Sequence, residues 1–284
     1  RRNAGEGSDR HNSQGDWSLT PGELNSMKNI SEAFHAQGKK FLVILNIGGV
    51  IETASWKNLP DAILLPWQPG EEGGNAIADI ISGKECPSGR LPMTFPLSYD
   101  DIPSSKNFPQ NDNGGVFDKN KSTIGYTNYD EGIWVGYRYF DTFAKPVSYP
   151  FGYGLSYTTF SFTGLKVQYG KSVCKVAVTV RNTGNVAGKE VAQLYISAPK
   201  STLEKPKKEL KSFAKTHLLQ PGESQTLTMT FSPMNLASFD EKTNSWVLDP
   251  GVYQIMVGES VENIKVTTSM KIAKGIQKKV PTVL

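Results

Sequence analysis

The stretch Lys40-Phe41-Leu42-Val43-Ile44-Leu45 is a nearly continuous apolar run, and it sets the fold class of the first half of the chain. Such a run is typical of a strand that is buried on both faces of a parallel sheet. A second run, Ala62-Ile63-Leu64-Leu65, predicts another buried strand at residues 61–66. Helices are expected before, between and after these strands. The alternation of strands and helices indicates an α/β domain.

The best-defined helix is expected to begin at Thr20-Pro21-Gly22-Glu23. Threonine at the N-cap, proline at the first helical position and glutamate two residues later form a capping box. Gly38 is expected to end this helix. Shorter helices are predicted at residues 51–56 and 71–82. The core-facing side of the first helix is predicted from apolar residues at helical spacing, which are Leu24, Met27, Ile30 and Phe34.

Glycine-rich turns follow both predicted strands, at Gly48-Gly49 and at residues 70–74. Neither turn matches the dinucleotide-binding pattern G-x-G-x-x-G or the lysine-containing phosphate loop. We therefore interpret them as tight connections between strands and helices, and we expect no nucleotide cofactor.

From about residue 158 the apolar period changes to two. Residues 175–180 alternate between apolar and polar side chains, and Asn182-Thr183-Gly184-Asn185 predicts a turn. Several short strands at this spacing are typical of an all-β sandwich. The strands predicted there comprise residues 173–180, 190–198, 207–218, 224–231, 246–248, 252–258 and 264–270. We expect these strands to show no exposed row of aromatic side chains.

Between the two patterned regions lies a long segment of irregular composition. Residues 87–96 contain three prolines and suit an edge strand. The following stretch, to about Trp134, is rich in polar residues, glycine and proline, as functional loops and linkers are. Its aromatic residues Tyr126, Tyr129 and Trp134 either line a sugar site or fix the loop to the body of the protein. Aromatic, glycine-punctuated residues 135–157 then predict a bridge between domains.

These patterns define three parts of the chain: an α/β domain at residues 1–109, a loop and aromatic interdomain bridge at residues 110–157, and a β-sandwich at residues 158–284. The net charge of +4 is too mild to indicate a nucleic-acid partner. Lysines between positions 200 and 215 suggest a solvated face that protects an edge strand. No Cys/His spacing fits a metal site, and the apolar runs are too short to span a membrane.

The chain begins close to a second informative stretch, Gly5-Glu6-Gly7-Ser8-Asp9-Arg10. Glycines on either side of Glu6 permit a tight, exposed turn. Asp9 and Arg10 could brace that turn with charge-assisted hydrogen bonds. No apolar leader follows Arg1-Arg2, and only four residues precede the loop, so we expect a chain that has been processed, split or excised.

Taken together, these motifs resemble the C-terminal half of glycoside hydrolase family 3, the β-glucosidase and β-xylosidase family. The resemblance extends over nearly the whole chain in the order of the family. The residues that carry it are Gly5–Arg10, Leu45–Gly48, Leu65–Ala76, Pro87–Pro96, Pro150–Tyr157, Arg181–Gly184, Gly188–Val191 and Leu236–Asp240.

The resemblance implies an α/β three-layer sandwich domain, truncated at its N-terminus, followed by a fibronectin type III-like domain. It also implies that Glu6 is the general acid/base of a retaining β-glycosidase, with Asp9 and Arg10 supporting it. Members of the family carry their nucleophilic Asp on a separate (β/α)₈ barrel, for which this chain has too few βα units. The chain alone is therefore expected to be inactive.

The implied partners are a barrel-containing polypeptide and an oligo- or aryl-β-glycoside substrate, with a homodimer also possible. The alternative is a non-catalytic carbohydrate-binding or structural two-domain module. Neither reading requires a cofactor, a nucleic acid or a membrane. The substrates usual for the family suggest a secreted or periplasmic compartment, and the sequence itself leaves the compartment open.

Overall fold

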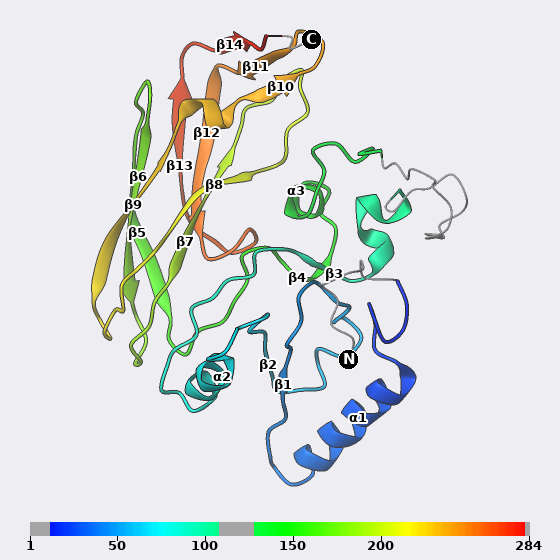
Figure 1. The fold of residues 1–284 in the computed structure, drawn as a ribbon. Helices are drawn as coiled ribbons and strands as arrows, with labels where there is room; N and C mark the ends of the chain where they lie inside the picture. Colours follow the sequence, from blue (N-terminus) through cyan, green and yellow to red (C-terminus); the bar gives the residue numbers. More distant parts are fainter. Residues whose placement is uncertain (1–11, 108–127, 282–284) are drawn as a thin grey trace. The chain divides into compact units, whose positions relative to one another are not determined.

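A computed structural model describes residues 12–107 and 128–281 of the chain (Figure 1). The chain forms two compact units that interleave along the sequence. The first unit comprises residues 1–84, 93–136 and 146–149, and the second comprises residues 85–92, 137–145 and 150–284. In the part of the chain described, no helix combines the length and the apolar character needed to cross a membrane.

Helix α1 (Pro21–His35) opens the described part of the first unit and confirms the predicted capping box. The Glu23 N–H donates to Thr20 Oγ1 at 3.2 Å, and the Thr20 N–H donates to Glu23 Oε2 at 2.8 Å. Leu24 and Met27 pack against the core as predicted. Ile30 and Phe34 are exposed instead and lie outside the core cluster of this unit.

Strands β1 (Leu42–Ile44) and β2 (Ala62–Leu64) pair in parallel, and helix α2 (Gly73–Ile81) follows them. These elements confirm the alternation that the two apolar runs predicted. The expected burial of the first strand on both faces is wrong for the described unit, since Ile44 is exposed. The two described strands form a sheet of their own, so each has an edge that pairs with no other described strand.

The predicted helix at residues 51–56 is absent, and turns take its place. The Glu52 carboxylate accepts hydrogen bonds from the Ser55 N–H and hydroxyl, at 2.6 and 2.7 Å. The indole N–H of Trp56 donates to the Glu52 carbonyl oxygen. Such local bonds compete with helix formation. Trp56 is buried together with Ile47 and Ile51, and these side chains form the centre of the core of the unit.

The rest of the first unit is irregular around one short pair of strands. Strand β3 (Phe95–Pro96) pairs antiparallel with β4 (Val147–Tyr149), so only the end of the predicted edge strand is regular. The 3₁₀ turns η1 (Tyr99–Asp101) and η2 (Pro103–Lys106) follow β3.

The second unit is a β-sandwich with an added small sheet. One layer has the strand order β5-β6-β9, the other has the order β13-β12-β7-β8, and the small sheet has the order β10-β11-β14 (Figure 1). The strands are β5 (Phe160–Gln168), β6 (Cys174–Asn182), β7 (Val191–Ser197), β8 (Glu209–Lys215), β9 (Ser224–Phe231), β10 (Ser238–Asp240), β11 (Ser245–Leu248), β12 (Gly251–Gly258), β13 (Ile264–Ile272) and β14 (Ile276–Lys279).

The strands predicted from the period of two are confirmed, whereas β5, β10 and β14 were missed. In β5 the alternation is broken at Gly164, where a positive φ of 64° accompanies a shift of register against β6. A bulge of this kind moves later side chains to the opposite face. The core lies between the layers and includes Val176, Val178, Leu194 and Ile255.

The outer face of β7 is covered by segments that do not belong to the sandwich. Helix α3 (Tyr137–Thr142) places the Tyr137 ring edge-on to Tyr195, at 6.2 Å between centroids. Gln193 donates from Nε2 to the carbonyl oxygen of Gly152 at 3.1 Å and accepts from the Tyr195 hydroxyl at 2.6 Å. Part of the predicted aromatic bridge therefore forms an outer layer on this unit.

The lysine cluster near β8 is less solvated than predicted. Lys205 pairs with Asp249, Lys207 and Lys208 pair with Asp141, and Lys211 pairs with Glu209. The Lys208 side chain is almost fully buried, as expected only for a paired lysine. Strand β8 does lie at the edge of its sheet, and several of its flanking lysines fix neighbouring segments rather than facing water.

Candidate functional site

The predicted catalytic residue Glu6 and its supporting residues Asp9 and Arg10 lie outside the described residues. The described chain resumes just after them, in a tight turn at residues 12–18. The Ser13 carbonyl oxygen accepts hydrogen bonds from the backbone N–H groups of Asp16, Trp17 and Ser18, and the Gly15 N–H donates to the Ser18 carbonyl oxygen at 2.7 Å. The backbone after the predicted catalytic stretch is therefore well defined.

Trp17 anchors this turn in the first unit. Its side chain is buried and meets the Tyr99 ring edge-on, at 5.4 Å between centroids. Its carbonyl oxygen accepts the N–H of Glu52 at 2.9 Å, which ties the turn to the loop after β1. The chain thus has a fixed point eleven residues after Glu6.

The loop after β1 lies at the carboxyl end of a parallel strand, where ligands often bind in α/β folds. Its polar side chains, however, are already engaged with neighbouring protein groups. Thr53 Oγ1 and Ser148 Oγ lie 2.7 Å apart, and Lys57 Nζ donates to the Ser148 carbonyl oxygen at 2.8 Å. The Glu52 carboxylate is likewise engaged by Ser55. The polar side chains of this loop therefore stabilise the fold and are not free for catalysis.

Tyr129 and Trp134, two aromatic residues of the central loop, differ in their exposure to solvent. Tyr126 lies outside the described residues. Tyr129 is 80% exposed, so the prediction that it fixes the loop to the body is wrong, while Trp134 is half-buried. The turn that carries both, residues 128–136, is held by Asn107, whose Nδ2 donates to the Asn128 carbonyl oxygen at 2.6 Å. We refer to residues 128–136 as the exposed turn.

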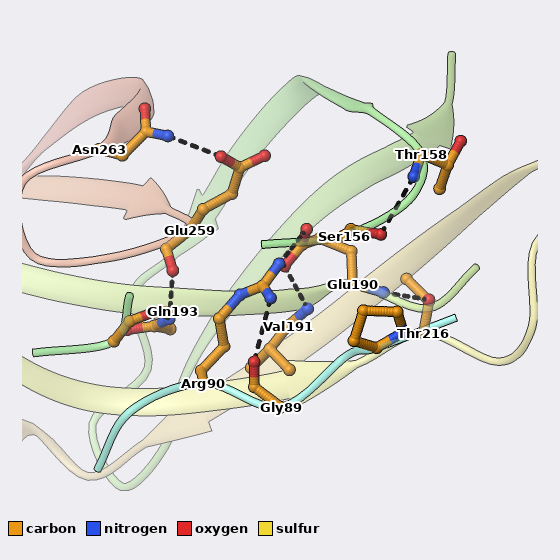
Figure 2. Close-up of polar contacts among 12 residues, drawn as sticks. Gly89, Arg90, Ser156, Thr158, Glu190, Val191, Gln193, Thr216, Glu259 and Asn263 are labelled. Atoms are coloured by element: carbon orange, nitrogen blue, oxygen red, sulfur yellow. Dashed lines mark hydrogen bonds and ion pairs between the residues drawn. The ribbon is translucent and has the colours of Figure 1, made fainter. Parts of the chain in front are cut away.

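A buried ion pair in the second unit joins Arg90 to Glu190 (Figure 2). Arg90 Nη2 donates to both carboxylate oxygens, at 2.7 and 2.6 Å, and the Val191 N–H donates to Glu190 Oε1 at 2.6 Å. The two side chains are only 7% and 1% exposed. Gly154 is required beside them, since a Cβ there would lie 2.5 Å from the Gly89 carbonyl oxygen.

Burial raises the pKa of the Glu190 carboxyl, while the Arg90 guanidinium and the Val191 N–H oppose that rise. Nearby, burial together with Lys189 and Arg90 lowers the pKa of Lys215. A raised carboxyl pKa is a property that a glycosidase acid requires. Glu190 has almost no solvent exposure and both of its oxygens are engaged, so it has a structural role instead.

The second unit also displays an aromatic pair that the sequence analysis did not anticipate. Phe239 and Trp246 face each other across β10 and β11, with ring centroids 5.3 Å apart, and both are exposed. The expectation of no exposed aromatic row is therefore wrong at this hairpin. The two residues are seven positions apart in sequence, and only the strand register brings them together.

Within the described ranges, no group of three or more His, Cys, Asp or Glu side chains is placed to hold a metal ion. Cys86 and Cys174 are both free thiols. Cys86 Sγ lies 3.2 Å from Ser156 Oγ in the second unit.

Comparison with known families accounts for both units. The glycosyl hydrolase family 3 C-terminal domain matches residues 1–157, and the fibronectin type III-like domain matches residues 190–261. The chain belongs to glycoside hydrolase family 3. This result confirms the resemblance and the predicted fold class, an α/β domain followed by a fibronectin type III-like sandwich.

The relatives of the chain within this family are glycosidases. It is 40% identical over 276 residues to beta-glucosidase A of Butyrivibrio fibrisolvens, a match that covers 88% of this chain and 31% of the relative. It is 39% identical over 240 residues to an exo-alpha-(1->6)-L-arabinopyranosidase of Bifidobacterium breve, covering 84% of this chain and 30% of the relative.

Solved structures give the same result. The structure of beta-glucosidase 3B from Thermotoga neapolitana in complex with glucose superposes with a TM-score of 0.89 at 44% identity, and the match covers 97% of this chain and 37% of that one. The chain spans about a third of the length of the curated relatives that it matches.

Proposed function

We propose that this chain supplies the general acid/base, Glu6, of a retaining β-glycosidase that removes terminal non-reducing β-linked sugars. The observation that carries the proposal is the stretch Gly5–Arg10, which lies within the matched family 3 domain of residues 1–157. The nucleophilic Asp would lie on a (β/α)₈ barrel outside these 284 residues. The names of the relatives support the hydrolase class.

In this mechanism the protonated Glu6 carboxyl donates its proton to the glycosidic oxygen as the bond to the anomeric carbon breaks. The Asp of the barrel attacks that carbon and forms a glycosyl ester. The Glu6 carboxylate then removes a proton from water, which attacks the anomeric carbon and releases the Asp. Asp9 and Arg10 would brace the loop through charge-assisted hydrogen bonds.

Retention of configuration requires two carboxyl groups about 5–5.5 Å apart. Because one of the two would come from the barrel, we expect no turnover from this chain alone. The domain limits of residues 1–109, 110–157 and 158–284 remain part of this proposal.

The identity of the sugar stays open within the proposal. The matched relatives include both a beta-glucosidase and an exo-alpha-(1->6)-L-arabinopyranosidase, so membership of the family does not select the glycone. Oligo- and aryl-β-glycosides are the first substrates to test. The exposed pair Phe239 and Trp246 offers ring surface for a sugar, which favours a second candidate function, a non-catalytic carbohydrate-binding module.

The decisive experiment compares Glu6→Gln with Glu71→Gln, a control at an exposed glutamate of the same unit. Each variant is combined with a barrel-containing polypeptide and assayed on aryl β-glucosides with good and poor leaving groups. Glu6→Gln should lower turnover of the poor leaving groups by about 10²–10⁴-fold.

Turnover of an activated aryl glycoside should fall less at the glycosylation step, and added azide should rescue deglycosylation, because azide needs no general base. The Glu71→Gln control should match the wild type. Equal turnover of Glu6→Gln and wild type on all substrates would refute the assignment. Robust turnover by the isolated chain would overturn the placement of the nucleophile on a barrel outside these 284 residues.

A further inference from the structure

The small sheet β10-β11-β14 carries an aromatic pair that the strand register holds together. Phe239 of β10 and Trp246 of β11 lie opposite each other, with ring centroids 5.3 Å apart, and their side chains are 39% and 44% exposed. Lys278 of β14 is in register with Trp246 from the other side and is exposed as well. Residues in register on neighbouring strands share one face of the sheet. We refer to Phe239, Trp246 and Lys278 as the cross-strand row.

Hydrogen bonds fix the backbone that carries this row, at one end of the sandwich (Figure 1). In the turn between β10 and β11, the Asp240 carboxylate accepts from the Lys242 N–H at 3.1 Å and from the Thr243 hydroxyl at 2.7 Å. Asn244 Nδ2 donates to the Val280 carbonyl oxygen at 3.0 Å, and the Val280 N–H donates to the Asn244 carbonyl oxygen at 2.9 Å. Rings held on a fixed backbone lose little conformational entropy when a ligand binds.

The open surface of the two rings is small. At 39% and 44% exposure, and with about 200 Å² for a whole aromatic side chain, Phe239 and Trp246 together offer roughly 150–200 Å². One partner in a standard protein interface buries about 800 Å². Neighbouring residues of the same sheet and turn are polar and exposed, namely Glu241, Lys242 and Lys279. A second copy of the chain or another protein would therefore find too little apolar surface here, whereas a sugar ring fits.

We propose that the cross-strand row binds a single soluble glucan chain. A glucose unit carries equatorial hydroxyls, so both faces of its ring expose axial C–H groups that pack on an aromatic ring. The hydroxyls project from the edge of the sugar, where the Lys278 ammonium and the Trp246 indole N–H can donate hydrogen bonds. Ring surface with a few polar groups beside it is the usual composition of a site for a small ligand.

The angle between the two rings selects the form of the glucan. The ring planes of Phe239 and Trp246 are inclined by 63°. A flat array of parallel chains, such as the face of crystalline cellulose, cannot lie against both rings at once. A single chain in solution twists between successive units, so two consecutive glucose units can each meet one ring. We therefore expect the row to bind soluble chains and to leave crystalline cellulose unbound.

The row lies entirely in the second unit, so glucan binding here does not depend on the role proposed for Glu6. In a catalytic chain the row would hold a substrate chain on the second unit. In a non-catalytic module it would be the principal ligand site. Tests of binding and of turnover can therefore fail separately.

The test is isothermal titration calorimetry of the full 284-residue chain with cellohexaose, laminarihexaose and maltohexaose, three glucose hexamers that differ in linkage. Trp246→Ala and Phe239→Ala each remove one ring, and Trp246→Phe keeps a ring. The matched control is Phe213→Ala, which removes an aromatic side chain of 68% exposure from β8 of the same unit. Circular dichroism checks folding, and a pull-down with crystalline cellulose tests the form of the glucan.

At least one hexaose should bind the wild type, and a comparison of the three gives the linkage that the row prefers. Each ring-removing variant should raise the Kd by about tenfold or more, since truncated aromatic anchors account for losses of this size. Trp246→Phe should raise it by less, and Phe213→Ala should leave it unchanged. Phe239→Ala decides the outcome where Trp246→Ala fails to fold. An unchanged Kd in a folded ring-removing variant, or an equal loss in the control, would overturn the inference.

The remaining outcomes are equally decisive. Failure of all three hexaoses to bind would overturn the inference and leave the row as a cross-strand contact that stabilises the small sheet. Binding to crystalline cellulose without binding to any hexaose would also overturn it. Glu6→Gln should bind the hexaoses as the wild type does. If it does, and if it also turns over aryl glycosides at the wild-type rate with the barrel polypeptide, the glucan site stands and the proposed acid/base role fails.

Discussion

Breaking the buried pair of Arg90 and Glu190 should destabilise the second unit in a manner that depends on which partner is removed. Arg90→Met leaves a carboxylate that is 1% exposed and that keeps the 2.6 Å hydrogen bond from the Val191 N–H but loses its ion-pair partner. Removing one partner of a buried ion pair costs about 3–5 kcal/mol. We expect a loss of this size for Arg90→Met near neutral pH.

The pH dependence distinguishes the two single variants. Burial raises the pKa of Glu190, and Arg90→Met removes the guanidinium that opposes the rise. A carboxyl whose folded pKa exceeds its unfolded pKa destabilises the fold as pH rises between the two values. The penalty in Arg90→Met should therefore shrink on acidification, by up to about 1.4 kcal/mol per pH unit in that window.

Glu190→Gln removes the carboxylate and leaves the Arg90 guanidinium without its ion-pair partner. The guanidinium of Arg90 cannot lose its proton in this range, so the stability of the Glu190→Gln variant itself should gain no pH dependence from this site. In the double variant Arg90→Met/Glu190→Gln neither charge is left without a partner. The double variant should consequently lose less than the sum of the single losses, by about 2–3 kcal/mol.

The assay is urea unfolding of the full chain, followed by circular dichroism at several pH values. Hydrogen exchange of the β7 amides assigns the change to the second unit. Additive losses in the double variant would refute the reasoning, as would a loss in Arg90→Met that stays constant from about pH 7 to about pH 5.

Two further predictions concern single sites. Lys40, the backbone N–H of Phe41 and His35 all donate to the Asp61 carboxylate and hold its pKa well below the ordinary range. Asp61→Asn should therefore lower stability at neutral pH, and thermal unfolding should show the difference from wild type shrinking progressively as pH falls below about 4 toward the folded pKa. Gly152→Ala should lower the stability of the second unit by about 2–4 kcal/mol in urea unfolding, because φ is 81° there and a Cβ would lie 2.1 Å from Gln193 Oε1; a change below about 0.5 kcal/mol would contradict this account.

The elements that sequence reasoning placed correctly are those whose signals are local. The capping box at Thr20 involves residues three positions apart, and the strands of the sandwich follow from alternation within one segment. The central bulge at Gly164 hid β5, because the alternation on its two sides is out of phase. The helix expected at residues 51–56 failed for a similarly local reason, since the Glu52 side chain stabilises turns there.

The sites depend on tertiary structure to a greater degree. Arg90 and Glu190 are one hundred residues apart in sequence, and no local pattern pairs them. The Phe239–Trp246 pair forms through the register of β10 and β11. The buried Lys208 forms an ion pair with Asp141 of α3, which lies far from it in sequence. Tyr129 is an aromatic residue of the type that often anchors a loop, and the fold of the turn leaves its side chain exposed.

By itself, the sequence determined the family, the order of the two folds and the candidate acid/base Glu6, because motifs and periods are written in neighbouring residues. Tertiary structure alone decided which charges are buried and paired and which aromatic side chains face water. These properties depend on contacts between distant segments, and the energy of each such contact comes from desolvation and packing that form only when the chain folds.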